Sequence, residues 1–149
     1  MQRRRIALVR TGIAAAIVLG TAITAAQSAR AIEICSGGDR AARRVTCLVD
    51  GDTGWERGVK WRLLDIDAPE TFEAECGQEK EIGKEATRRL LVLMSAGYRL
   101  VESGEKDHTS DRRSLVRIVL ADGRDAGRIL LQEGLAQRWP NKGNRWCGF

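Results

Sequence analysis

Residues 80–95 carry the one long helical pattern of this chain, and short strand patterns surround it. The apolar side chains of this segment recur at steps of three and four residues: Ile82, Ala86, Leu90, Leu93 and Met94. Strand patterns bounded by turn residues lie at 44–49, 54–57, 59–66, 99–102 and 115–120, and a second, short helix is expected at 126–133. This order predicts an α+β, mainly β domain. We expect a small, closed or nearly closed five-stranded barrel with two or three helices packed on it.

Residues 1–31 have the pattern of a secretory signal peptide rather than of a folded element. They contain five arginines, no acidic residue and a weakly apolar run over 13–26. Ala29 and Ala31 supply small residues at the positions that a signal peptidase reads. A retained membrane anchor is the alternative, but a spanning helix needs about 20 mostly apolar residues. We therefore expect an exported protein, periplasmic or secreted, with a single domain over 32–149 and no membrane association after cleavage.

The charge of the chain is placed unevenly. The 149 residues include 25 basic and 20 acidic side chains, a formal charge of +5. Because residues 1–31 hold five of the basic residues, residues 32–149 carry 20 of each sign and are neutral. Bulk attraction to polyanions is therefore excluded as an argument for function. The two halves of this region differ in charge. Residues 32–87 hold 8 basic and 13 acidic residues, whereas residues 88–149 hold 12 basic and 7 acidic residues.

All four cysteines lie in the expected domain: Cys35, Cys47, Cys76 and Cys147. An even number in a small exported chain indicates two disulfides, for which three pairings are possible. We favour Cys35–Cys47, which closes a local loop, and Cys76–Cys147, which ties the tail to the body. A zinc site is the rival interpretation. The cysteine spacings match no compact ligand pattern, and His108 is the single histidine.

Two acidic clusters follow predicted strands, at residues 50–53 (Asp-Gly-Asp-Thr) and 65–70 (Asp-Ile-Asp-Ala-Pro-Glu). Carboxylates gathered at neighbouring strand ends would favour a hard cation, because Ca²⁺ and Mg²⁺ prefer oxygen ligands. Each cluster alone is a weak signal, because tripeptides such as Asp-Gly-Asp are usually just turns. Arg62 lies on the strand that leads to the second cluster. An arginine beside metal-binding carboxylates suits a phosphodiester substrate, although it can equally neutralise surplus carboxylates.

Four segments in this order resemble the staphylococcal-nuclease-like (thermonuclease) family. They are Val-Asp-Gly-Asp-Thr at 49–53, Arg-Leu-Leu-Asp-Ile-Asp-Ala-Pro-Glu at 62–70, Cys-Gly-Gln-Glu at 76–79, and residues 127–136. The resemblance runs over about 44–139, and the ordered combination is more specific than any single piece. It implies an OB-fold barrel with helices and a Ca²⁺-dependent phosphodiesterase. Such an enzyme acts on DNA and RNA and leaves 3′-phosphate ends.

The resemblance also implies roles for individual residues. Asp52 and Asp67 match the side-chain ligands of the calcium ion, with the carbonyl of Ala68 as a third ligand. Glu70 matches the general base of the family, which orients or deprotonates the attacking water. Arg62 matches the first phosphate-binding arginine. Together these groups would polarise the phosphate, supply a base and stabilise charge in the transition state.

The second arginine of the family is harder to locate. The family usually shows Asp-x-Tyr-Gly-Arg before the last long strand, whereas residues 109–117 read Thr-Ser-Asp-Arg-Arg-Ser-Leu-Val-Arg. The alignment makes Arg113 the match, Arg112 is an alternative, and the pair can also be part of a solvated loop. A second departure is Gly54, where an apolar residue is common, and we expect it to loosen its strand.

Aromatic residues give a weaker signal. The four tryptophans at 55, 61, 139 and 146 could stack on bases, but we expect them in the core or against the tail. We predict a monomeric nuclease that binds Ca²⁺ and cleaves DNA, RNA or both. The alternatives are an OB-fold module that binds nucleic acid without cutting it and an exported interaction domain.

Overall fold

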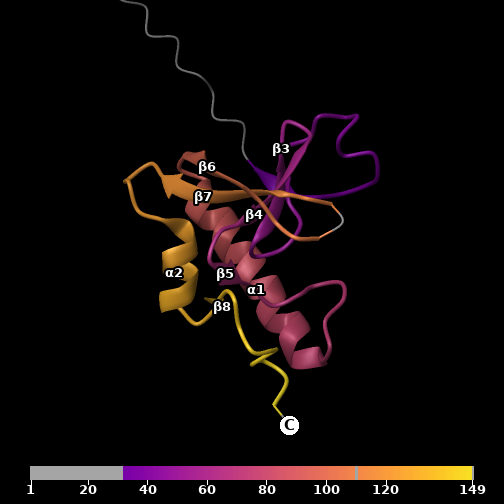
Figure 1. Ribbon diagram of the computed structural model, residues 1–149, viewed down its shortest axis with the longest axis vertical. Coiled ribbons are helices and arrows are strands. Elements are labelled where there is room, and N and C mark those ends of the chain that lie inside the picture. Colours follow the sequence, from indigo (N-terminus) through magenta and orange to yellow (C-terminus); the bar gives the residue numbers. More distant parts are fainter. Residues whose placement is uncertain (1–31, 110, 149) are drawn as a thin grey trace, which may run out of the picture.

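A computed structural model describes residues 32–109 and 111–148, so the predicted signal peptide lies outside the described residues. Figure 1 shows the arrangement of its two helices and eight strands. The strands are β1 (Glu33–Ile34), β2 (Cys47–Leu48), β3 (Thr53–Glu56), β4 (Val59–Leu63), β5 (Ile66–Asp67), β6 (Tyr98–Lys106), β7 (Ser114–Leu120) and β8 (Gln137–Arg138). The helices are α1 (Gly77–Met94) and α2 (Ala126–Gln132).

Six of the strands form one sheet in the order β1-β2-β3-β4-β7-β6, and β5 pairs with β8 in a second, two-stranded sheet. The β1–β2 and β4–β7 pairs are parallel, and the other pairs are antiparallel. The predicted α+β, mainly β class is confirmed. Within residues 32–109 and 111–148, the edge strands β1 and β6 do not pair, so the sheet is open rather than fully closed.

The core lies between the sheet and the two helices. Apolar residues of α1, β4, β7 and α2 form it, including Leu90, Trp61, Ile118 and Leu130. Helix α1 begins three residues earlier than predicted, because the sulfur of Cys76 caps it by accepting a hydrogen bond from Glu79 N at 3.4 Å. The tail returns to this end of α1, as Figure 1 shows.

Several strand bounds differ from the prediction. Strand β4 ends at Leu63, because Asp65 adopts a left-handed φ of 64° and the chain turns there. Residues 66–67 then join the second sheet as β5. Strand β6 extends to Lys106, well beyond the predicted 99–102, since its exposed polar half still pairs with β7 across a register shift. A search for alternating apolar residues cannot predict this part of the strand, because its side chains are polar and exposed.

Gly54 makes room for a neighbouring ring instead of loosening its strand. It pairs with Trp61 on β4, and a Cβ at position 54 would lie 2.3 Å from Trp61 Cζ2. The Trp61 side chain is fully buried over it. The expectation of a looser strand was therefore wrong, because the aromatic ring fills the place of the missing side chain.

Two disulfides join Cys35 to Cys47 and Cys76 to Cys147, the pairing favoured from the sequence. All four sulfurs are used in these bonds, which leaves no thiolate for zinc among the described residues. Within the same part of the chain, neither helix combines the length and the apolar character that crossing a bilayer requires.

Candidate active site

The first acidic cluster is a turn held by Asp50. Asp50 Oδ1 accepts hydrogen bonds from the backbone N–H of Asp52 at 3.0 Å and of Thr53 at 2.7 Å. Asp50 is buried, and this burial together with the charge of Asp52 raises its pKa well above the ordinary value. The turn directs Asp52 away from solvent, so that its side chain is only 3% exposed.

Asp52 joins the two acidic clusters. Its Oδ2 accepts the backbone N–H of Ala68 at 2.8 Å, and its Oδ1 accepts the hydroxyl of Thr53 at 2.9 Å. The turn before β3 and the end of β5 therefore lie side by side, although they are 16 residues apart in sequence. This is the juxtaposition that the strand-end argument predicted.

Arg62 lies between two carboxylates. Its Nη2 is 3.1 Å from Asp52 Oδ2 and 2.7 Å from Asp67 Oδ1. Burial alone would lower the pKa of Arg62, but the negative charges of Asp52 and Asp67 raise it, so the guanidinium stays charged. Its side chain is 14% exposed, so one edge of the site reaches solvent.

Asp67 has two further partners that the sequence analysis missed. The side-chain amides of Gln137 and Asn141 both donate to Asp67 Oδ2 at 2.9 Å. The pairing of β5 with β8 brings Gln137 directly opposite Asp67. The favoured Cys76–Cys147 disulfide was the one sequence signal that the tail lies close to this region, and it did not single out these two amides.

Glu70 sits in a loop anchored by a buried glutamate. Glu79, near the start of α1, accepts the backbone N–H of Glu70 at 3.2 Å on Oε1 and that of Glu75 at 2.6 Å on Oε2. The helix comes so close that a Cβ on Gly83 would lie 2.8 Å from Glu70 O. Burial raises the pKa of the Glu70 carboxyl, and the charge of Asp52 adds to this, while Arg62 opposes it.

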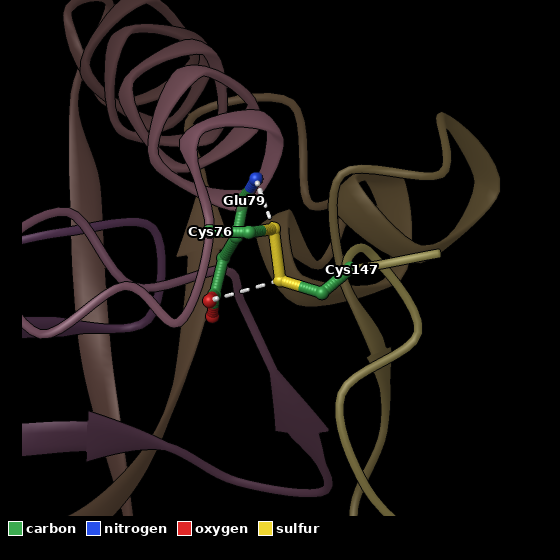
Figure 2. A group of neighbouring side chains, drawn as sticks. All are labelled: Cys76, Glu79 and Cys147. Atoms are coloured by element: carbon green, nitrogen blue, oxygen red, sulfur yellow. Dashed lines mark hydrogen bonds between the residues drawn. A yellow bond between two sulfur atoms is a disulfide. The ribbon is translucent and has the colours of Figure 1, made fainter. Parts of the chain in front are cut away.

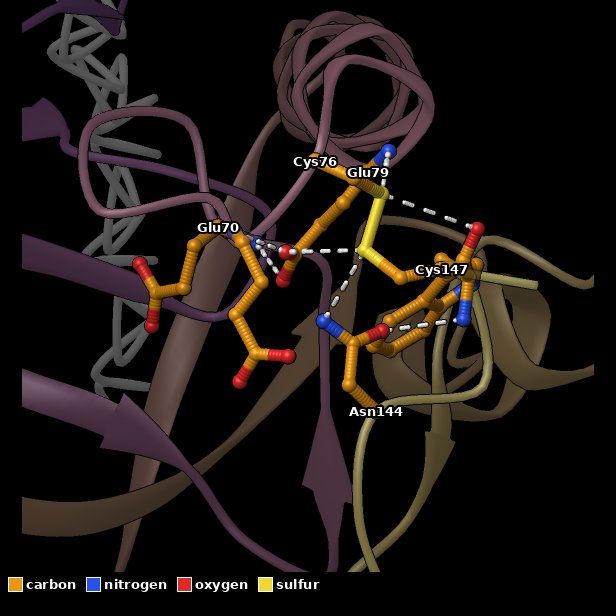
Figure 3. The surroundings of a disulfide bond; sticks show 7 residues. Glu70, Cys76, Glu79, Asn144 and Cys147 are labelled. Carbon is orange, nitrogen blue, oxygen red and sulfur yellow. Dashed lines mark hydrogen bonds between the residues drawn. A yellow bond between two sulfur atoms is a disulfide. The ribbon is translucent and has the colours of Figure 1, made fainter. Parts of the chain in front are cut away.

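A second group of possible metal ligands surrounds the disulfide at the start of α1. Cys76, Glu79 and Cys147 bring their ligand atoms within 4.8 Å of one another, as Figure 2 shows. The two sulfurs are bonded to each other and offer no thiolate, so this group does not suit a metal ion. This group has a structural role instead. As Figure 3 shows, Glu79 lies between the loop of Glu70 and the Cys76–Cys147 disulfide, and contacts both.

Arg113, the match for the second arginine, lies beside the first acidic cluster. Its Nη1 donates to Thr53 Oγ1 at 3.2 Å, and its Nε pairs with Asp107. Burial alone would raise the pKa of Asp107, but hydrogen bonds from Arg113 and Thr109 lower it. The Arg113 side chain is 13% exposed and is fixed toward the first acidic cluster.

Arg112, in the same loop, is exposed. It lines an open hollow together with Lys106 and His108. Its φ of 46° is left-handed, and it occupies the position of the glycine that the family pattern would place there. The turn therefore keeps a glycine-like conformation without a glycine, immediately before Arg113 and its contact with Thr53.

Trp139 lies beside Arg62 rather than in the core. This residue is 54% exposed, and the guanidinium carbon of Arg62 is 6.0 Å from the ring centroid, at the limit of a cation–π contact. Trp61 and Trp146 are buried, as expected, whereas the expectation was wrong for Trp139. It follows β8 directly, and the strand carries it to the rim of the site.

Comparison with known proteins bears on this arrangement. The family model described as staphylococcal nuclease homologue matches residues 60–145, which is more than half of the chain. The chain belongs to the staphylococcal nuclease homologue family. This family has the OB-fold, and its members are generally nucleases. No curated protein matches the chain. The matched range includes Arg62, Asp67, Ala68 and Arg113, whereas Asp52 lies before it and joins the site through Ala68 N.

The donor set of this staphylococcal nuclease homologue suits a hard cation. The carboxylates of Asp50, Asp52, Asp67 and Glu70 gather in one cluster, and Arg62 is the cation in direct contact with it among the described residues. The side chains offer oxygen ligands and no sulfur or imidazole. Such a surplus of negative oxygen donors is what Ca²⁺ and Mg²⁺ prefer.

Proposed function

We propose that this protein is an exported, Ca²⁺-dependent nuclease that hydrolyses phosphodiester bonds of DNA, RNA or both and leaves 3′-phosphate ends. The observation that carries the proposal is the shared arginine. Arg62 Nη2 contacts both Asp52 and Asp67 at the meeting point of the two acidic clusters. Family membership supports a nuclease, and this cluster supports a cation and a phosphate at one place.

Asp52, Asp67 and the carbonyl of Ala68 would hold the calcium ion. When bound, Ca²⁺ would polarise a phosphoryl oxygen and offset negative charge. Glu70 lies in the neighbouring loop, where a partly buried carboxylate can accept a proton from the attacking water.

The two arginines approach the cluster from different elements. Arg62 comes from β4, and Arg113 comes from the residue before β7. A guanidinium donates to phosphate oxygens in a fixed fork geometry, so two of them would bind and stabilise the charge that develops on a phosphoryl group.

The proposal is tested by digestion of plasmid DNA and of RNA with the oxidised protein, in Ca²⁺ or in chelator. We expect cleavage only in Ca²⁺, and a decrease of about 10²–10⁴-fold in the Glu70→Gln variant. The matched control is Glu73→Gln, the same change at an exposed position of the same loop. Fragments that a polynucleotide kinase labels at the 5′ end without prior phosphatase treatment would identify 3′-phosphate products.

Other results would select other functions. Binding of nucleic acid without cleavage at any Ca²⁺ concentration would select the non-catalytic OB-fold module. Neither binding nor cleavage would select the exported interaction domain.

Export and the monomeric state belong to the same proposal. Two disulfides and no free cysteine among the described residues support an oxidising compartment. The test is cell fractionation with and without residues 1–31, and light scattering of the purified protein measures its oligomeric state. Retention of the full chain in the cytoplasm would contradict export, and a dimer mass would contradict the monomer.

A further inference from the structure

The tail of the chain contributes two side chains to the candidate cation site. Gln137 and Asn141 both donate to Asp67 Oδ2 at 2.9 Å, from β8 and from the segment after it. Gln137 is buried, and the Asp67 side chain is 21% exposed. Neither amide carries a charge, so the two do not neutralise Asp67. They act on its carboxylate through hydrogen bonds alone.

Their hydrogen bonds fix which way each amide faces. Gln137 Nε2 also donates to the carbonyl of Gly143 at 3.2 Å, so its NH₂ group lies between two acceptors. Asn141 Oδ1 accepts the backbone N–H of Gly143 at 2.9 Å, which leaves its NH₂ group for Asp67. A flipped amide would lose these partners, and the orientation follows from the network itself.

The two oxygens of Asp67 are consequently unlike. An ionised carboxylate oxygen has about two lone pairs. Among the residues that the structure describes, Gln137 and Asn141 use both on Oδ2, whereas Oδ1 accepts one hydrogen bond, from Arg62. Oδ1 therefore keeps acceptor capacity, and it lies on the side that shares Arg62 with Asp52.

We propose that Gln137 and Asn141 are positioning residues: they saturate Asp67 Oδ2 and present Oδ1 to the cation. This rests on the proposed calcium site, and it deepens that proposal by assigning the tail to it. Partners that orient a metal ligand typically contribute about 10–100-fold to metal affinity. The side chains themselves do not contact the ion.

The test is Ca²⁺ binding measured by calorimetry on the oxidised protein without nucleic acid. We expect Asn141→Ala and Gln137→Ala to weaken the affinity by about tenfold or more each. The matched control is Asn144→Ala, a tail asparagine of similar burial whose amide meets Cys147 Sγ and Trp146 N instead of Asp67. Its affinity should stay within about twofold of the unmodified protein, a small fraction of the effect that orienting partners have.

A merely structural role is separated by a second measurement. Urea unfolding of each variant in chelator measures its stability without the ion. If the residue only positions Asp67, the variant is folded in this assay and still binds Ca²⁺ more weakly. Excess Ca²⁺ should then restore cleavage by Asn141→Ala. Because Gln137 is buried, its variant can fail to fold, and in that event the half-buried Asn141 decides the question.

The outcomes distinguish this inference from the proposed function. Unchanged Ca²⁺ affinity in folded Asn141→Ala would overturn the positioning role while leaving a calcium site. No Ca²⁺ binding by the unmodified protein would overturn both.

Discussion

Arg113 Nη1 donates to Thr53 Oγ1 at 3.2 Å, which joins residues 60 positions apart in the sequence. The Thr53 hydroxyl in turn donates to Asp52 Oδ1 at 2.9 Å. One hydroxyl thus connects the loop before β7 with the acidic turn before β3. This link favours Arg113 over the adjacent Arg112 as the second arginine of the proposed site.

Replacing Arg113 by alanine should affect activity far more than replacing Arg112. Loss of one preorganised donor to a transition state typically costs about 10²–10³-fold in kcat. We expect this for Arg113→Ala and a change within about threefold for Arg112→Ala, since Arg112 is exposed and lines the open hollow with Lys106 and His108. Initial rates on one DNA substrate measure both. Equal rates for the two variants would contradict the assignment of Arg113.

Thr53 should matter for stability as well as for the site. Thr53→Val keeps the branched shape but leaves Asp52 Oδ1 without its donor in a buried place. We expect a loss of about 1–3 kcal/mol in the free energy of unfolding, because a buried acceptor then has no partner. Thr53→Ser keeps the hydroxyl and serves as the control. Urea unfolding curves of the two variants should differ clearly, and coincident curves would reject the role of the hydroxyl.

The two disulfides should contribute unequally. Cys76–Cys147 closes a loop of 71 residues, whereas Cys35–Cys47 closes one of 12. Removing a native disulfide from a small domain typically costs about 2–5 kcal/mol, and the longer loop should cost more because its closure restricts the unfolded chain more. Paired serine variants, one disulfide at a time, test this by denaturant unfolding. A larger loss for the Cys35–Cys47 variant would contradict the loop-length argument.

Tyr98 provides a test of how stability depends on pH. Burial raises the pKa of Tyr98 above its ordinary value, and its hydrogen bond to Glu56 Oε2 at 2.8 Å raises it further. The folded state holds this proton more tightly than the unfolded state. Its contribution to stability is therefore complete below about pH 10, the ordinary tyrosine value, and is lost as the pH rises above it.

Because Tyr98 is the single tyrosine of the chain, phenolate absorbance follows it alone. We expect ionisation of the folded protein at a higher pH than of the urea-unfolded protein. Glu56→Gln should move the folded titration downward, since it removes the neighbouring charge. Identical titrations for the folded and unfolded protein would reject the burial effect.

The parts of this fold that follow from local pattern could be predicted from the sequence. The period of apolar residues located α1, and turn residues located the acidic turn before β3 and the start of β4, whereas the end of β4 was predicted three residues too late. Strands β1 and β8 have two residues each, too few to show any alternation. They exist because distant segments pair with them, which a local pattern cannot report.

The same distinction holds for the candidate site. Asp52 and Asp67 stand in recognisable motifs, so their types and spacing pointed to an oxygen-rich cluster. Gln137 and Asn141 stand in a segment that has no motif, and only the pairing of β5 with β8 brings them to Asp67. The left-handed Arg112 was also hidden, because that conformation usually requires glycine or asparagine.

The position of the two amides has a consequence for protein synthesis. Every candidate ligand and both arginines precede residue 114, whereas Gln137, Asn141 and Cys147 follow them on the chain. A growing polypeptide therefore contains its entire acidic cluster well before it contains the groups that bind Asp67 Oδ2. The described arrangement is completed only when residues 137–147 join the fold and Cys147 meets Cys76. Until then the acidic cluster lacks both amide partners of Asp67 Oδ2.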